Sequence, residues 1–165
     1  MTQNNFVNGQ KNNKKGYRFL LSLNEEQKLA KAKIINSDVS VILGKAGSGK
    51  TLLACQIALQ MLLEKHVTKI IITRPTVSKE DIGFLPGNLD EKMGPWVAPI
   101  YSNMYQLLRR ERVDKMIKDD QIEVVPVSYM RGRTFVNSAI IVDECQNLEH
   151  NQTLMILQRI GLNSK

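Results

Sequence analysis

Cysteine, aromatic residues and long apolar runs are all scarce in this chain of 165 residues, which holds two cysteines and 5% aromatic residues. Two cysteines cannot form a disulfide framework, which is typical of a reducing compartment, so we expect a cytoplasmic location. No apolar run approaches the ~18 residues that a membrane-spanning helix needs, and the opening Met-Thr-Gln-Asn-Asn is not a secretory leader. These absences exclude the disulfide-rich and membrane-spanning classes and predict no membrane partner.

The composition that remains is ordinary for a globular protein, with one unusual feature, its charge. Hydrophobic residues make up 42% and charged residues 24%, and 165 residues are the length of one domain. The formal net charge of +7 favours a polyanionic partner, a nucleotide or a nucleic acid. Four of these seven charges, Lys11, Lys14, Lys15 and Arg18, lie at the start of the chain, where no acidic residue occurs. We therefore expect residues 1–18 to form a disordered polar tail, either a solvated terminus or a basic arm for nucleic acid.

Helix and strand patterns alternate along the rest of the chain. Apolar, β-branched runs predict strands, and apolar residues at helical spacing predict helices. The run just before Gly44 is expected to be a buried strand, and Asn24 is expected to cap the first helix. The alternation predicts an α/β fold with a mostly parallel sheet. The expected strands are 39–43, 69–73, 122–127 and 139–142, and the expected helices are 24–35, 50–65, 153–160 and one or two within 96–119.

A glycine-rich segment follows the first expected strand and matches the phosphate-loop pattern G-x-x-x-x-G-K-[ST] at every fixed position. Glycines let backbone N–H groups approach phosphate oxygens, and the N-terminus of the next helix adds partial positive charge. Lys50 can reach the β- and γ-phosphates, and the Thr51 hydroxyl can ligate Mg²⁺. The segment therefore predicts a nucleoside triphosphate site made of Gly44, Lys45, Ala46, Gly47, Ser48, Gly49, Lys50 and Thr51.

Two carboxylates follow the last expected strand. Asp143 and Glu144 come directly after the apolar run 139–142, so they would face the same crevice as the phosphate loop at the carboxyl end of a parallel sheet. We expect Asp143 to hold Mg²⁺. Glu144 is the candidate general base for an attacking water.

Three more polar residues are candidates for the remaining tasks of hydrolysis. Gln146 lies just after the acidic pair, where it can sense the γ-phosphate. Arg131 or Arg133 can supply the cation that stabilises the transition state, from the same chain or from a neighbouring subunit. Arginines such as these are also common in surface salt bridges, and that interpretation stays open. If neither arginine reaches the phosphate of its own chain, a neighbour must supply it, which favours a homo-oligomeric ring.

Several sequence blocks in a fixed order resemble those of the PhoH-like proteins, P-loop ATPases of the phosphate-starvation type related to superfamily 1 helicases. The resemblance covers about residues 20–165 and implies a RecA-like core, with ATP and Mg²⁺ as cofactors and coupling to single-stranded RNA or DNA. It also implies that Gln27 reads adenine, as the glutamine of the helicase Q motif does. Besides the phosphate loop, the blocks are Leu23-Asn24-Glu25-Glu26-Gln27, Thr73-Arg74-Pro75, Gly83-Phe84-Leu85-Pro86-Gly87-Asn88-Leu89 with Lys92, Pro95, Pro99 and Tyr101, Tyr129 to Thr134, Asp143-Glu144-Cys145-Gln146-Asn147 and Arg159-Ile160-Gly161.

One departure from the family pattern is expected to matter. The sequence stops at Lys165, before the strand and the Gly-Asp-x-x-Gln block with which the family senses the γ-phosphate, so residues 19–165 would form an ATPase domain that lacks its C-terminal strand or strands. The leading hypothesis is an ATPase coupled to RNA or DNA. The alternatives are a nucleotide-binding module with little turnover and a small P-loop kinase. The acidic block argues against the kinase, because a kinase needs an acceptor pocket rather than a base poised for water.

Overall fold

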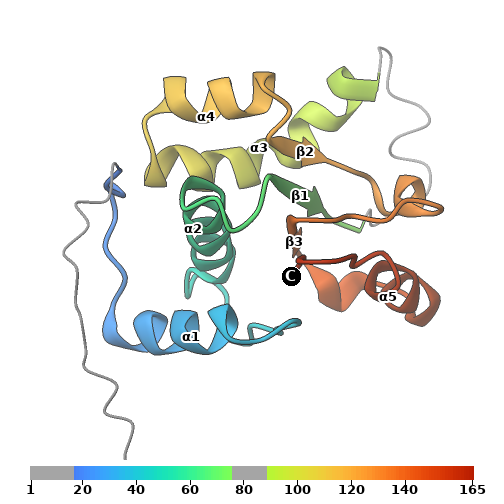
Figure 1. Cartoon of the computed structure of the whole chain (residues 1–165), viewed down its shortest axis with the longest axis horizontal. Coiled ribbons are helices and arrows are strands. Elements are labelled where there is room, and N and C mark those ends of the chain that lie inside the picture. Colours follow the sequence, from blue (N-terminus) through green and yellow to red (C-terminus); the bar gives the residue numbers. More distant parts are fainter. Residues whose placement is uncertain (1–16, 76–88) are drawn as a thin grey trace, which may run out of the picture.

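The computed structural model describes residues 17–75 and 89–165 of the chain, without the side chains of 89–96. In these residues helices flank both faces of a three-stranded parallel sheet, so the predicted α/β fold class is confirmed (Figure 1). The segment 83–88 and most of the expected tail over 1–18 lie outside the described residues. The same holds for the side chains of Leu89, Lys92 and Pro95.

The sheet has β1 (Lys69–Thr73) at its centre, between β2 (Ile122–Val124) and β3 (Ser138–Val142). Both neighbours run parallel to β1. Parallel strands need crossover connections, and helices supply them here. Because all three strands run the same way, their carboxyl ends meet at one edge, where the candidate acidic residues follow β3.

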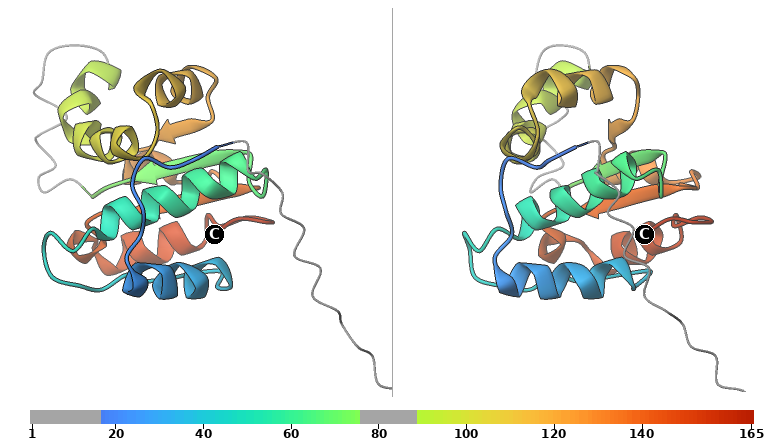
Figure 2. Two further views of the ribbon diagram at one scale, coloured as in Figure 1. Left: turned by 90° about the vertical axis from the view of Figure 1, so that its left-hand side faces the viewer. Right: turned by 60° about the vertical axis from the view of Figure 1, so that its left-hand side comes forward.

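Helices cover the sheet on both sides (Figure 1). One side carries α2, against which α3 packs, and the other carries α5 and the short helix η1. Both views of Figure 2 place α3 and α4 at one end of the molecule and α1 at the other. The bounds are α1 Glu25–Ile35, α2 Lys50–Leu63, α3 Leu89–Leu107, α4 Arg110–Lys118, η1 Val127–Met130, η2 Cys145–Asn147 and α5 His150–Leu157.

Two apolar clusters hold these layers together. Ile70 and Ile72 enter the larger cluster with Leu59 of α2 and residues of α3 and α4. Ile71, on the opposite face of the same strand, packs in the smaller cluster with Ile156 of α5. Fully burying one such side chain stabilises the fold by about 1.5–3 kcal/mol. Strand β1 is therefore an unbroken apolar run because both of its faces are buried.

The strongest periodic segments match their predictions. The helix expected over 50–65 and the strands expected over 69–73 and 139–142 are confirmed. The region within 96–119 holds the end of α3 and all of α4, so the expectation of one or two helices is also confirmed.

Two elements begin or end elsewhere than predicted, for local reasons. The strand expected over 122–127 ends at Val124 because Pro126, which lacks an N–H, precedes η1. The helix expected over 153–160 begins at His150 because Glu149 and the third helical residue form a capping box.

The first helix has the predicted cap but buries less than its pattern suggests. Asn24 accepts a hydrogen bond from the Gln27 N–H at 2.8 Å, and its own N–H donates to the Gln27 side chain at 3.1 Å. The expected apolar side is largely solvated. The structure describes all of α1 and finds no buried residue in it, and Leu29 is 67% exposed. Ala30 and Ile34 are partly buried against the larger cluster.

The prediction of a buried strand over 39–43 is wrong. Within the described residues this segment pairs with no strand, and Val39, Val41 and Leu43 are 54%, 70% and 87% exposed. Ile42 alone in this run is partly buried and packs against the larger cluster. The helix expected after the phosphate loop is therefore present, whereas the strand expected before the loop does not form within the described residues.

The physical reason is that the sheet edge formed by β3, on the side away from β1, already bonds another segment. The Ile140 N–H there donates to the Lys165 carbonyl at 2.7 Å, and the Lys165 N–H donates to the Ser138 carbonyl at 3.0 Å. The Lys165 ammonium donates to the carbonyl of Ile35, the last residue of α1, at 2.6 Å and to the carbonyl of Ser37 at 2.7 Å. A β-branched run becomes a strand only where a neighbouring edge offers hydrogen bonds, and this edge is partly taken.

Candidate nucleotide site

The phosphate loop between residues 44 and 49 takes a shape that requires glycine at several points. Gly47 and Gly49 have φ angles of +75° and +80°, a region that residues with a Cβ rarely adopt. A Cβ on Gly44 would lie 2.9 Å from the Ser48 hydroxyl oxygen, so the Ser48 side chain would have to shift to admit one. The pattern in the sequence therefore corresponds to a real backbone constraint.

Helix α2 begins directly at the end of this loop. Its N-cap, Gly49, supplies no side-chain hydrogen bond, so the first N–H groups of the helix stay available to a ligand. The Lys50 ammonium donates to the carbonyls of Gly44 and Lys45, both at 2.9 Å, which holds it inside the loop. A helix N-terminus with free N–H groups and a nearby cation is suited to bind phosphate.

The predicted metal ligands lie together, although they come from different elements. Thr51 in the first turn of α2 donates its hydroxyl hydrogen to an Asp143 carboxylate oxygen at 2.9 Å. The Asp143 N–H donates to the Thr73 carbonyl at 2.9 Å, which fixes the residue at the carboxyl end of the sheet. The sheet therefore brings an acid beside the phosphate loop, as the crevice argument predicted.

Glu144 follows Asp143 in an unusual backbone conformation. Its φ and ψ are +53° and +38°, the left-handed region, which costs a residue with a side chain on the order of 1–3 kcal/mol. This conformation turns the chain from β3 into η2. The Gln146 side chain donates a hydrogen bond to the Glu144 carboxylate. The two predicted catalytic residues are therefore in contact.

Gln27 also lies at the loop. Its side-chain oxygen is used by the capping box with Asn24, which directs its NH₂ group elsewhere. A Cβ on Gly49 would lie 3.1 Å from this Gln27 nitrogen, so the amide is in contact distance of the loop. The structure brings together α1, the loop and the end of β3.

The two candidate arginines have different surroundings. Arg133 donates to both carboxylate oxygens of Glu123, at 2.7 and 3.0 Å, and its guanidinium lies 4.7 Å from the centre of the Phe135 ring. The hydrogen bond from Arg133 holds the pKa of the Glu123 carboxyl below its usual value, and Lys69 at 2.8 Å adds to this. The structure therefore favours the salt-bridge interpretation for Arg133.

Arg131 is exposed and pairs with no acidic residue in the described part of the chain. It lines a pocket between η1 and α5 together with Ser128, Glu149 and Gln152. It remains the better candidate for a cation that acts on a phosphate, from this chain or from a neighbour.

One group of cations belongs to none of the motifs in the sequence. Arg18, Arg109 and Arg112 line a second pocket, far from the phosphate loop along the chain. The spacing of Arg109 and Arg112 at the start of α4 was a visible signal, but nothing in the sequence brings Arg18 beside them.

Comparison with protein families decides the identity of the chain. A family model described as PhoH-like protein matches residues 20–165. The chain belongs to the PhoH-like family. The expected resemblance is thus confirmed, and it assigns the chain to a family of nucleotide-binding, ATPase-type proteins. Among the residues that the structure describes, no helix combines the length and apolarity needed to cross a bilayer.

Curated members of the PhoH-like family are similar over most of this chain. The PhoH-like protein of Synechocystis sp. is 43% identical over 129 residues, which are 78% of this chain and 39% of that protein. The PhoH-like protein of Bacillus subtilis is 41% identical over 130 residues, 78% of this chain and 41% of that protein. Protein PhoH of Escherichia coli is 37% identical over 147 residues, 87% of this chain and 42% of that protein. The chain spans about two fifths of the length of these relatives.

Proposed function

We propose that this domain binds ATP together with Mg²⁺ and hydrolyses it. The observation that carries the proposal is the contact between Thr51 and Asp143, which places an acid from the end of β3 at the mouth of the phosphate loop. The loop, the N-terminus of α2 and Lys50 would hold the triphosphate. Gln27, in contact with the loop, would hold the adenine. A protein of this kind fits a cytoplasmic location.

The residues at the proposed metal site fit Mg²⁺. Thr51 and Asp143 offer oxygen atoms, which Mg²⁺ prefers as ligands, and these two oxygens lie 2.9 Å apart, so both residues would hold the ion, Asp143 directly or through a water. When bound, the ion supplies neutralisation of charge on the β- and γ-phosphates. The protein's part is to hold these two oxygens in place.

Hydrolysis would use Glu144 as its base. A water would attack the γ-phosphorus, Glu144 would take the proton of that water, and the bond to the β-phosphate oxygen would break to leave ADP and phosphate. Gln146, which contacts the Glu144 carboxylate, would orient this base. Arg131 would supply the cation for the transition state. Supply from a neighbouring subunit would require a homo-oligomeric ring.

Binding with little turnover is the second candidate, and one observation favours it. Arg133 is already held by Glu123, so Arg131 is the one of the two predicted cations that is left to act on a phosphate. A nucleotide-binding module would show MgATP affinity with negligible phosphate release.

Coupling to single-stranded RNA or DNA is a further part of the proposal, supported by the net charge of +7. The test is ATP turnover measured with and without each nucleic acid at two salt concentrations, because phosphate contacts weaken with salt. Stimulation that falls with salt is expected. Turnover that ignores both nucleic acids would contradict the coupling.

The ATP site itself is tested with Lys50→Ala, with Lys118→Ala as the matched control. Lys118 is an exposed lysine in the last turn of α4. Calorimetric titration with MgATP should show loss of binding in Lys50→Ala and normal binding in the control. Normal binding in Lys50→Ala would sink the site assignment. In a separate mixing experiment, inactive Lys50→Ala and Arg131→Ala subunits that regain turnover together would support an arginine supplied by a neighbour.

A further inference from the structure

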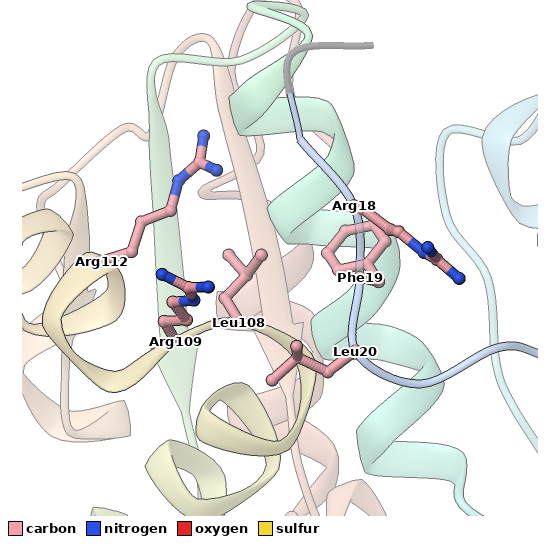
Figure 3. A pocket seen from close by; sticks show the side chains of 6 residues that line it. All are labelled: Arg18, Phe19, Leu20, Leu108, Arg109 and Arg112. Atoms are coloured by element: carbon pink, nitrogen blue, oxygen red, sulfur yellow. The ribbon is translucent and has the colours of Figure 1, made fainter. Parts of the chain in front are cut away.

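A pocket of about 440 Å³ lies between the segment that precedes α1 and the start of α4 (Figure 3). This volume is within the ~300–1,000 Å³ typical of small-molecule sites. Apolar side chains and arginines share its wall in a mixed arrangement. The lining residues are Arg18, Phe19, Leu20, Leu108, Arg109 and Arg112.

The wall formed by residues 17–20 is held firmly in place. The Leu20 N–H donates to the Leu107 carbonyl at 2.9 Å, which ties the segment to the end of α3. The Tyr17 hydroxyl donates to Glu64 at 2.7 Å, and the rings of Tyr17 and Phe19 meet edge to face at 5.4 Å. The pocket therefore has a fixed backbone on one side and the start of a helix on the other.

Two arginines of this pocket differ from the neighbouring Arg110 in their ion pairs. Arg109 and Arg112 have exposed side chains and form no ion pair with any residue that the structure describes. Arg110, between them, pairs with Asp114 at 3.7 Å and lies over the Tyr105 ring at 4.9 Å. Among the described residues that line the pocket, none is acidic. Like charges held together without an acid attract anions.

Figure 3 shows that the three arginines point in different directions. Arg109 and Arg112 lie on the same side of the pocket, with Leu108 next to them, whereas the guanidinium of Arg18 points away from both. Phe19 and Leu20 face them from the opposite wall. One side of the pocket thus offers planar donors, which suit phosphate, and the other offers an aromatic ring and an aliphatic side chain.

This pocket is separate from the ATP site. Its wall is anchored at Glu64, the C-cap of α2, while the phosphate loop leads into the N-terminus of the same helix. A helix of 14 residues is about 20 Å long at 1.5 Å per residue. A triphosphate held by Lys50 would therefore not fill both places.

We propose that this pocket is a second phosphate site that binds a nucleoside phosphate, either free or within a single-stranded nucleic acid. Arg109 and Arg112 hold the phosphate, and Phe19, Leu20 and Leu108 pack against the base or the sugar. The site lies outside the ATP-binding residues. If its ligand is a single-stranded nucleic acid, this proposal rests on the coupling to RNA or DNA that is part of the proposed function.

The test uses the full chain with Arg109→Gln and Arg112→Gln combined. The probes are a short fluorescein-labelled oligouridine followed by anisotropy, and AMP and inorganic phosphate followed by calorimetry. We expect about a tenfold loss of oligouridine affinity and a salt slope smaller by about 0.7, because the two arginines hold one phosphate and each lost phosphate contact removes about 0.7 on a single strand. The matched control, Arg110→Gln, should change affinity less than about twofold, since Arg110 is already paired.

The other measurements show whether the ligand is a free nucleotide or a nucleic-acid strand, and which results would contradict the proposal. A parallel loss of AMP binding identifies a free nucleotide as ligand, and a loss limited to oligouridine identifies a strand. Equal affinity in the double variant and the wild type for every probe, or binding of inorganic phosphate alone, overturns the proposal. Lys50→Ala should lose MgATP and keep both AMP and oligouridine, so this site and the ATP site fail separately. Normal MgATP binding by the double variant shows that it is folded.

Discussion

The side chains of Thr51 and Asp143, which are 92 positions apart in the sequence, meet in a hydrogen bond of 2.9 Å. This contact joins the first turn of α2 to the end of β3 and places an acid at the phosphate loop. We expect Thr51→Val, which removes the hydroxyl at nearly constant shape, to lower MgATP affinity about 10- to 100-fold, as the loss of a contact with a charged group costs about 1.5–3 kcal/mol. Calorimetry with and without Mg²⁺ checks this. Thr51→Ser, which keeps the hydroxyl, is the control, and equal affinity of Thr51→Val and wild type would contradict the metal assignment.

Glu144 is expected to be needed for turnover and not for binding. Removing a general base lowers the rate by about 10²–10⁴-fold, so Glu144→Gln should retain MgATP affinity while phosphate release falls by that factor. Gln146→Ala should have a smaller effect, because Gln146 acts through the Glu144 carboxylate. Unchanged phosphate release in Glu144→Gln would remove this residue from its role.

The exposed segment over 39–43 gives a direct test of the fold. Val41 is 70% exposed and Val125 is 2% exposed, so the same substitution, valine to threonine, should act differently at the two sites. Val41→Thr should change the free energy of unfolding by less than about 0.5 kcal/mol, as surface changes do. Val125→Thr buries a hydroxyl and should cost about 1–3 kcal/mol. Urea denaturation measures both, and equal losses would show that the segment is buried after all.

The salt bridge between Arg133 and Glu123 makes a pH-dependent contribution to stability. Because the hydrogen bond from Arg133 lowers the pKa of Glu123 in the folded state, the contribution is present above the unfolded pKa and is lost as pH falls through the folded one. We expect Glu123→Gln to be less stable than wild type by about 1 kcal/mol at neutral pH. The difference should shrink in acid. Denaturation curves across this range check the sign, and a difference that grows in acid would contradict it.

The two cysteines should react differently with thiol reagents. Burial, with a contribution from the Asp143 charge, raises the pKa of Cys55 to about 12, whereas Cys145 is exposed. Only the thiolate is nucleophilic, so a disulfide reagent at mildly alkaline pH should modify one thiol in the folded protein and both after denaturation. Mass spectrometry should locate the fast site at Cys145. Rapid modification of Cys55 in the folded state would contradict its placement in the core.

Elements that depend on residues close together in the sequence were predictable, and elements that depend on distant residues were not. The Asn24 cap, the helix after the phosphate loop and the apolar strands β1 and β3 were predictable, because each depends on residues within a few positions. The run over 39–43 has the same strand-like composition as β1, yet it is solvated. Composition states a preference for a pleated surface, and the availability of an edge decides whether a strand forms.

In the candidate site too, local motifs were predictable and long-range contacts were not. The loop residues and the pair Asp143 and Glu144 could be named from contiguous motifs. The different surroundings of Arg131 and Arg133 could not be predicted, because they depend on Glu123 in β2, which lies near Arg133 only in the folded chain. The pocket lined by Arg109 and Arg112 was missed for a similar reason, since its opposite wall comes from a distant part of the sequence.

The phosphate loop, the acidic pair and membership of the PhoH-like family follow from the order of the amino acids, because each depends on neighbouring residues whose chemistry is local. The contact of Thr51 with Asp143, the pairing of Arg133 with Glu123 and the exposure of 39–43 arise only in the folded chain. These outcomes depend on the order β2-β1-β3, which sets the segments that lie side by side. Spacing along a chain does not encode that order, since long-range pairing is fixed by the burial of both faces of β1 and by the edges that remain.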